Sequence, residues 1–167
     1  MSTDAKNPSE VRERLYKEVD DARYGMLGVI GAPVQHHFNP MACYPDKATG
    51  DIWFFTKKGT DLVKDAGLGE HAMFIVTSKD QEFQACIGGE LREQYDRAKL
   101  EQFWNPHIAA WYPDGKDDPE LTMLRFDPHD ADVWISRAGP VKYAFEVAKA
   151  NATHSVPDVG DQTSIQL

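Results

Sequence analysis

The sequence has few cysteines, no long hydrophobic run and little positive charge. Two cysteines, Cys43 and Cys86, cannot build a disulfide framework, and without a Cys-x-x-Cys pair the common zinc and redox motifs are excluded. No segment approaches the ~18 apolar residues of a membrane span, and residues 1–21 hold no apolar run that could act as a secretion signal. We therefore expect a cytoplasmic protein without a membrane partner.

Negative charge dominates the composition. The chain has 18 Lys and Arg residues against 27 Asp and Glu residues, for a formal net charge of −9. Such a surface repels a phosphate backbone, so we do not expect nucleic acid as a partner. Hydrophobic residues make up 41% of the 167, enough for one well-filled core. We predict a single domain over residues 1–152 with a helix at each end, followed by a polar, mobile tail, 153–167.

Turn signals and hydrophobic periodicity divide the chain into short elements. A helix is expected to begin at Asn7, an N-cap residue followed by Pro8 and, three positions after the cap, by Glu10. Predicted strands are 24–31, 34–44, 52–56, 71–78, 82–93, 121–126 and 131–136, the last two joined by a turn at 127–130. Further predicted helices are 61–66, 96–104 and 139–152, the last with Val141, Phe145 and Ala148 along one face. Such closely spaced strands favour an antiparallel barrel with flanking helices, an α+β fold, over a parallel sheet.

Residues 104–121, WNPHIAAWYPDGKDDPEL, form the most unusual segment. Asp114, Asp117 and Asp118 resemble the acidic frame of a calcium loop at first sight. A calcium loop requires ligands at alternating positions and a closing glutamate, whereas these residues lack that spacing and Pro119 follows directly. We predict instead a rigid excursion that is anchored by burial of its two tryptophans.

Several segments together resemble a known family. They are NPM at 39–41, WFFT at 53–56, GGEL at 88–91, DRAKLEQFWNPHIAAWYPDGKDDPEL at 96–121 and VWIS at 133–136. Over Glu10 to Lys149 the sequence is similar to the general-stress-protein branch of the pyridoxamine 5'-phosphate oxidase-like split barrels. The resemblance implies an antiparallel, six-stranded split β-barrel that forms a homodimer and binds FMN between its subunits.

The resemblance also implies where FMN would lie. FMN needs an apolar slot for its ring system and a cationic or N–H-rich site for its phosphate. The candidate ring contacts are Asn39, Pro40, Met41, Phe55, Thr56, Gln84, Trp111 and Trp134. For each of these residues, ordinary packing in the barrel is the alternative.

The phosphate end departs from the family's pattern. Members usually carry an arginine before the Pro-Met pair and a lysine two positions after a hydroxyl residue, whereas this chain has Asn39 and Leu62 there. The groups that could replace the two missing cations are Lys57, Lys58, Thr60 and Lys64. A solvated basic turn before a short helix is the alternative interpretation.

No residue pattern names a reaction. His36 and His37 would face opposite sides of a strand, so we assign no metal site, and no catalytic residue is identified. The C-terminus lacks the arginine-and-histidine motif of the vitamin B6 oxidases, which disfavours pyridoxamine phosphate oxidation. The expected function is FMN binding by a stress-associated protein, with oxidoreductase activity on an unidentified small molecule. The alternative is a flavin-free or weakly binding protein that keeps the barrel as a binding or scaffold module.

Overall fold

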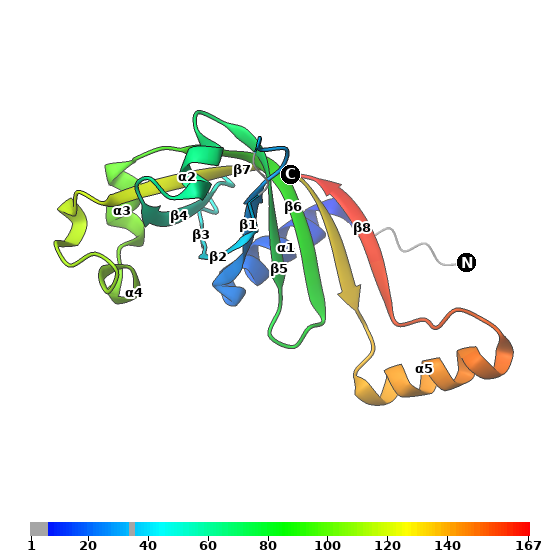
Figure 1. Ribbon diagram of the computed structural model, residues 1–167. Coiled ribbons are helices and arrows are strands. Elements are labelled where there is room, and N and C mark those ends of the chain that lie inside the picture. Colours follow the sequence, from blue (N-terminus) through cyan, green and yellow to red (C-terminus); the bar gives the residue numbers. More distant parts are fainter. Residues whose placement is uncertain (1–6, 34–35) are drawn as a thin grey trace.

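One antiparallel sheet dominates the computed structural model, which describes residues 7–33 and 36–167 (Figure 1). Its strands are β1 (Tyr24–Val29), β2 (Asn39–Ala42), β3 (Tyr44–Pro45), β4 (Ile52–Lys57), β5 (Glu70–Thr77), β6 (Phe83–Glu93), β7 (Leu121–Ser136) and β8 (Gly160–Gln166). The order across the sheet is β2-β1-β5-β6-β7-β4-β3, and β8 pairs with β7. The predicted mainly-β, antiparallel fold with flanking helices is confirmed, although the described residues form eight strands where the family resemblance implies a six-stranded barrel.

Helices flank the sheet. They are α1 (Pro8–Ala22), α2 (Asp61–Ala66), α3 (Arg97–Phe103), α4 (Pro106–Ala109) and α5 (Pro140–Thr153), with a 3-10 turn η1 (Gly115–Asp117). α1 begins where the sequence predicts, because the Asn7 side chain accepts a hydrogen bond from the backbone N–H of Ser9 at 3.2 Å. Among the described residues, no helix combines the length and the apolarity needed to span a membrane.

The main core fills the inner face of the sheet. The apolar stripe of α1, Val11, Leu15 and Val19, packs there against inward side chains of the strands. Phe54 and Phe74 meet edge to face at the centre, with ring centroids 5.1 Å apart. The alternation predicted for β6 is confirmed, because its odd-numbered residues 83, 85 and 87 are buried while 84 and 86 are not.

The opposite, outer face of the sheet has two ends that differ. At the end formed by β3, β4 and the first half of β7, outward side chains such as Trp53 and Met123 are buried under α3, α4 and the segment 104–121. We call this region the covered end; Leu100, Ile108 and Tyr112 supply its cover. The predicted rigid excursion and α3 therefore form a lid over part of the sheet, and we call residues 97–121 the lid.

At the other end of the outer face, large apolar side chains remain partly exposed. Cross-strand register places Met26 beside Ile75, and Gln84 beside Trp134. Tyr24, Met26, Ile75 and Trp134 are 40% to 60% exposed there. We call these four residues with Gln84 the bare face. Exposed apolar side chains gathered on one surface indicate a binding site or an interface.

β7 is one continuous strand rather than the two strands and turn that the sequence predicts. Gly88 pairs with Asp130 and Gly89 pairs with Pro128, which leaves His129 as an extra residue in a β-bulge. A Cβ atom on Gly89 would lie 2.2 Å from the backbone oxygen of Asp127, so the bulge requires glycine opposite it. Pro128 is tolerated because a bulge removes the need for a regular ladder hydrogen bond.

The C-terminal segment also differs from the prediction of a mobile tail. Residues Gly160–Gln166 form β8, which pairs along Asp130–Ser136 of β7. The pairing satisfies backbone groups of the second half of β7, where β4 no longer lies alongside. Ile165, the buried residue of β8, turns into the main core. Short polar strands of this kind give a weak signal in sequence.

Candidate functional site

A cavity of about 440 Å³ opens where β2, β4 and the segment 104–121 meet. We call it the aromatic pocket. Its lining residues are Tyr24, Pro40, Met41, Ala42, Tyr44, Phe55, Thr56, Lys57, Thr60, His107, Ile108, Trp111 and Tyr112. Aromatic and aliphatic side chains make up most of this wall, which suits a flat, largely apolar ligand group.

The strands fix one side of the aromatic pocket. Ala42 of β2 pairs with Tyr24 of β1, so Pro40 and Met41 lie along the edge of the sheet. Phe55 of β4 packs edge to face on Tyr44, with ring centroids 5.2 Å apart at 87°. This contact holds Phe55 between the pocket and the covered end.

The other side of the pocket is built by α4, which Asn105 holds in place. The Asn105 side-chain oxygen accepts hydrogen bonds from the backbone N–H groups of His107 at 2.8 Å and Ile108 at 3.1 Å. Ile108 is buried, whereas Trp111 is 72% exposed. The predicted burial of both tryptophans in this segment is therefore wrong for Trp111, which lies at the pocket instead of in the core.

The polar groups of the pocket gather where β4 ends. Thr56, Lys57 and Thr60 line it there. The Thr60 hydroxyl oxygen accepts a hydrogen bond from the backbone N–H of Val63 at 3.4 Å and caps α2. Lys57 is exposed and forms no ion pair with any residue of 7–33 or 36–167. Lys57 is thus the lysine available to an anionic group in this pocket.

The other phosphate candidates lie elsewhere. Lys58 lines a separate polar cleft, and Lys64 is 3.9 Å from Asp61. Asn39 is exposed and donates a hydrogen bond to the backbone carbonyl two residues before it. Leu62 is buried in the main core, so the residue at this position faces inward and could not present a cation to the pocket. None of these four side chains lines the aromatic pocket.

Gln84 and Trp134 line a different hollow of about 310 Å³ on the bare face. They are register partners on β6 and β7, and Trp134 also pairs with Gln162 of β8. Tyr143 of α5 completes one side of this hollow. Both predicted residues are exposed at the surface, and they do not line the aromatic pocket of their own chain.

His36 and His37 precede β2 and are not in a strand, so the argument from opposite strand faces does not apply to them. Part of the strand predicted at 34–44 lies outside the described residues. His36 Nδ1 is 2.6 Å from a carboxylate oxygen of Asp65, a hydrogen bond that raises the pKa of the imidazole. The contact ties this loop to α2. Within the described chain, no group of three or more His, Cys, Asp or Glu side chains could hold a metal.

The acidic segment stabilises its own turn. Asp118 is buried, and its two carboxylate oxygens accept hydrogen bonds from the backbone N–H groups of Asp114 at 3.3 Å and Glu120 at 2.9 Å. These contacts are a structural use of Asp118 that the sequence pattern did not reveal. They fix the backbone of residues 114–120 relative to one another.

Two tyrosines shape the electrostatics of the pocket, Tyr112, which is buried, and Tyr44, which is half-buried. Burial raises the pKa of Tyr112 to about 12 and also raises the pKa of Tyr44. Both side chains therefore stay neutral at physiological pH and can donate hydrogen bonds. A neutral aromatic wall with Lys57 at one end fits a ligand that has a flat ring system and an anionic group.

Comparisons with known proteins agree with this fold. Residues 10–158 match the family described as "Pyridoxamine 5'-phosphate oxidase like". A candidate general stress protein 26 from Jannaschia sp. CCS1 is 32% identical, covers 95% of this chain and 99% of its own, and superposes with a TM-score of 0.78. The general stress FMN/FAD binding protein from Xanthomonas citri is 36% identical over 78% of this chain and 92% of its own, with a TM-score of 0.72. No curated protein matches the sequence.

Proposed function

The chain belongs to the pyridoxamine 5'-phosphate oxidase-like family, and on this premise we propose that it binds FMN in the aromatic pocket and works as a flavin-dependent oxidoreductase. One observation carries the proposal: residues that the sequence singles out for flavin meet at one cavity. They are Pro40, Met41, Phe55, Thr56, Lys57, Thr60 and Trp111. Segments far apart in the chain converge there, with the types of side chain that a flavin requires.

The pocket residues divide into two groups that suit the two parts of FMN. Pro40, Met41 and Phe55 offer an apolar surface to the ring system, and exposed Trp111 adds an aromatic wall. Lys57, with the hydroxyl groups of Thr56 and Thr60, would hold the phosphate. When bound, FMN supplies redox chemistry, while the protein positions the ring and controls access to it.

We further propose that the site is completed by a second copy of the chain. In the sheet order β1-β5-β6-β7, Trp134 lies three strands from Tyr24, or about 14 Å at the usual strand spacing. Gln84 and Trp134 are therefore too far away to line the aromatic pocket of their own chain. A homodimer formed through the apolar bare face would bring these two residues to the partner's pocket, which begins at Tyr24 on that same face.

Two adjacent lysines provide a sharp test. Lys57 lines the aromatic pocket and Lys58 does not, so Lys58→Ala is a matched control for Lys57→Ala. A charge-assisted phosphate contact contributes about 1.5–3 kcal/mol, so Lys57→Ala should weaken FMN binding tenfold or more. Riboflavin, which lacks the phosphate, should bind equally well to both variants. Fluorescence titrations measure these affinities, and equal FMN affinities for the two variants would discard the phosphate assignment.

The second candidate function is a module that binds flavin weakly or not at all. The absence of a cation at Asn39 favours it, because only Lys57 of the candidate lysines lines the pocket. Equal and weak fluorescence responses to FMN and riboflavin in the unmodified protein would support this function. Saturable binding selective for FMN would support the flavin enzyme.

A further inference from the structure

His36 lies beside the segment that would hold the flavin phosphate. Its Nδ1 is 2.6 Å from a carboxylate oxygen of Asp65, and its Nε2 is 3.9 Å from a carboxylate oxygen of Asp61. Asp61 directly follows Thr60, which lines the aromatic pocket and is the N-cap residue of α2. The His36 side chain therefore joins the loop before β2 to the two carboxylates nearest to this end of the pocket.

A carboxylate next to Thr60 disfavours a phosphate in the pocket, because like charges repel one another. Two cations offset the charge of Asp61. Lys64 is one, at 3.9 Å, and His36 is the other when it carries a proton. Protonated His36 also offsets the charge of Asp65. The electrostatic potential at the phosphate end of the pocket thus contains a contribution that exists only while the imidazole is protonated.

His36 is also close in sequence to a position where this chain lacks a cation. It precedes Asn39 by three residues, and Asn39 begins β2, the strand that supplies Pro40 and Met41 to the pocket. An arginine at position 39 would bring a permanent positive charge. A histidine that is held by two carboxylates brings instead a positive charge that it can lose within the physiological pH range.

We propose that His36 determines the preference of the pocket for a phosphorylated flavin. With a proton it neutralises the carboxylates beside Thr60, and without one it leaves them to repel the phosphate. His36 is thus a positioning residue, since it acts on the phosphate through Asp61 and α2. The inference rests on the proposed function, because it requires the FMN phosphate to lie at Lys57 and Thr60.

The contacts of His36 give the direction of the pH effect. Its hydrogen bond to Asp65 raises the pKa of the imidazole above the ordinary value of about 6.5, with Asp61 adding to the rise while burial and Lys64 oppose it. The imidazole is therefore charged below that ordinary value and loses its charge as the pH rises through the raised one. FMN affinity should fall over the same range, whereas the affinity for riboflavin, which has no phosphate, should not follow it.

Titrations of both flavins from about pH 7 to about pH 9 measure this difference, because a phosphate with its second pKa near 6 stays a dianion in this range. At low ionic strength we expect FMN affinity to fall about threefold or more, and riboflavin affinity to change little. His36→Asn should bind FMN more weakly at the lower pH and show no such fall. His36→Arg, which keeps a positive charge, should retain its FMN affinity at the higher pH.

His129→Asn is the matched control, because His129 also lies near a carboxylate, that of Asp127 at 3.6 Å, but does not line the pocket. This variant should keep the pH profile of the unmodified protein. A second readout needs no turnover: by reciprocal linkage, FMN should raise the pKa of His36 as measured by NMR, and riboflavin should not.

The outcomes separate this inference from the proposed function. FMN binding with the same pH profile in His36→Asn and the unmodified protein overturns the inference and leaves the proposed function standing. Equal losses of FMN and riboflavin affinity in His36→Asn also overturn it, because the histidine would then support the loop and not the phosphate. An unmodified protein that binds no FMN at any of these pH values overturns the proposed function and the inference together.

Discussion

The covered end and the bare face are parts of the same outer surface, and they differ in what shields them from water. Trp53 and Met123 at the covered end are buried by a lid from their own chain, whereas Met26 and Ile75 at the bare face stay half exposed. The aromatic pocket lies between the two regions, with Trp111 and Ile108 from the lid and Tyr24 from the bare face. The covered end belongs to the packed interior of the chain, whereas the bare face leaves apolar side chains exposed, as the proposed homodimer would require.

The largest effect on stability should come from the lid. Leu100 of α3 is fully buried at the covered end, so Leu100→Ala should lower the free energy of unfolding by about 3 kcal/mol through lost burial and a residual cavity. Urea denaturation of the purified variant measures the loss. Leu68→Ala is the control because Leu68 is almost fully exposed. A loss below about 1 kcal/mol would show that the lid is not part of the cooperative core.

The bare face should respond in the opposite manner, with association affected and stability unchanged. Ile75→Asp places a charge at the centre of the proposed interface, so we expect the dimer dissociation constant to rise about a hundredfold, or ~2.7 kcal/mol. The melting temperature of the monomer should not fall. Sedimentation equilibrium checks the result, with Leu68→Asp as the matched exposed position. If Ile75→Asp unfolds the protein while association is unaffected, the contrast between the two regions is lost.

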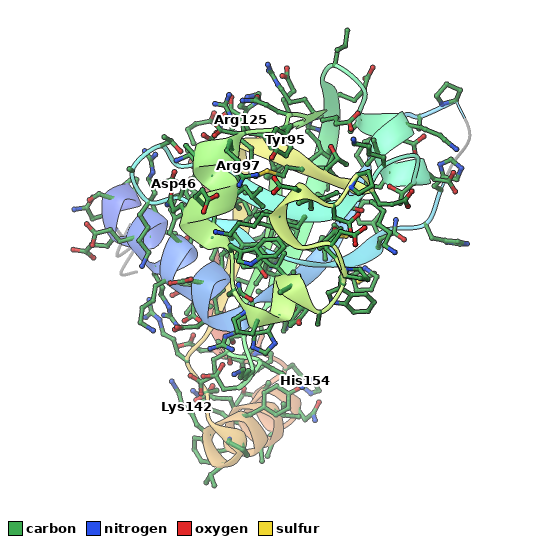
Figure 2. All side chains as sticks on the ribbon, turned by 90° about the vertical axis from the view of Figure 1, so that its left-hand side faces the viewer. Asp46, Tyr95, Arg97, Arg125, Lys142 and His154 are labelled. Atoms are coloured by element: carbon green, nitrogen blue, oxygen red, sulfur yellow. The ribbon has the colours of Figure 1, made fainter. Side chains whose placement is uncertain are left out.

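A buried ion pair ties the lid to the sheet and makes its stability depend on pH. The Lys99 ammonium group of α3 donates to the buried carboxylate of Asp46, which lies near α3 in Figure 2, and this bond lowers the pKa of Asp46. Because the pKa is lower in the folded state, the stabilisation is present above the unfolded-state pKa of about 4 and is lost as the pH falls through the folded-state value.

Asp46→Asn should therefore cost about 2 kcal/mol at pH 7, and the variant should approach the unmodified protein in stability at acidic pH. Urea unfolding over a pH series measures the difference. Asp117→Asn is the control, because Asp117 pairs with Arg97 at an exposed position where an ion pair contributes less than about 1 kcal/mol. A cost that does not change with pH would mean that packing rather than charge explains it.

The smallest expected effect concerns the cap of the pocket wall. Asn105→Ala removes the acceptor for two backbone N–H groups at the start of α4 and should destabilise the protein by about 1 kcal/mol. Asn105→Asp keeps the acceptor and should recover most of this loss. Thermal unfolding resolves the difference, and equal melting temperatures for the two variants would argue against the cap.

Much of the fold could be predicted from local patterns. The alternation in β6, the cap at Asn7 and the hairpin turns each depend on near neighbours, and the structure contains the corresponding elements. β7 was harder, because the Asp-Pro-His-Asp segment has turn composition but is held in a strand by Gly89 opposite it. β8 was missed because its polar sequence forms a strand only where β7 offers free backbone groups.

For the candidate site, the sequence predicts which types of side chain are present better than it predicts where those side chains point. It selected both Lys57 and Lys58, but adjacent residues at a strand end point to different cavities, and only Lys57 lines the aromatic pocket. The sequence interpretation treats Leu62 as a missing phosphate cation, whereas this side chain is buried in the main core, a direction that depends on how α2 packs. His107 and Tyr112 line the pocket and were missed, since nothing in their local sequence distinguishes them from other residues of the lid.

His129, the additional residue of the bulge, changes the curvature of β7 and not the direction in which its side chains point. Inward positions of β7 are even-numbered before it, as at Leu124 and Phe126, and odd-numbered after it, as at Ala131 and Val133. Removing His129 would bring both halves into one regular alternation with every side chain still facing its present way. The strand would then straighten, because a bulge is what bends it. Gain or loss of a single residue here during evolution could thus change the angle between the aromatic pocket and helix α5.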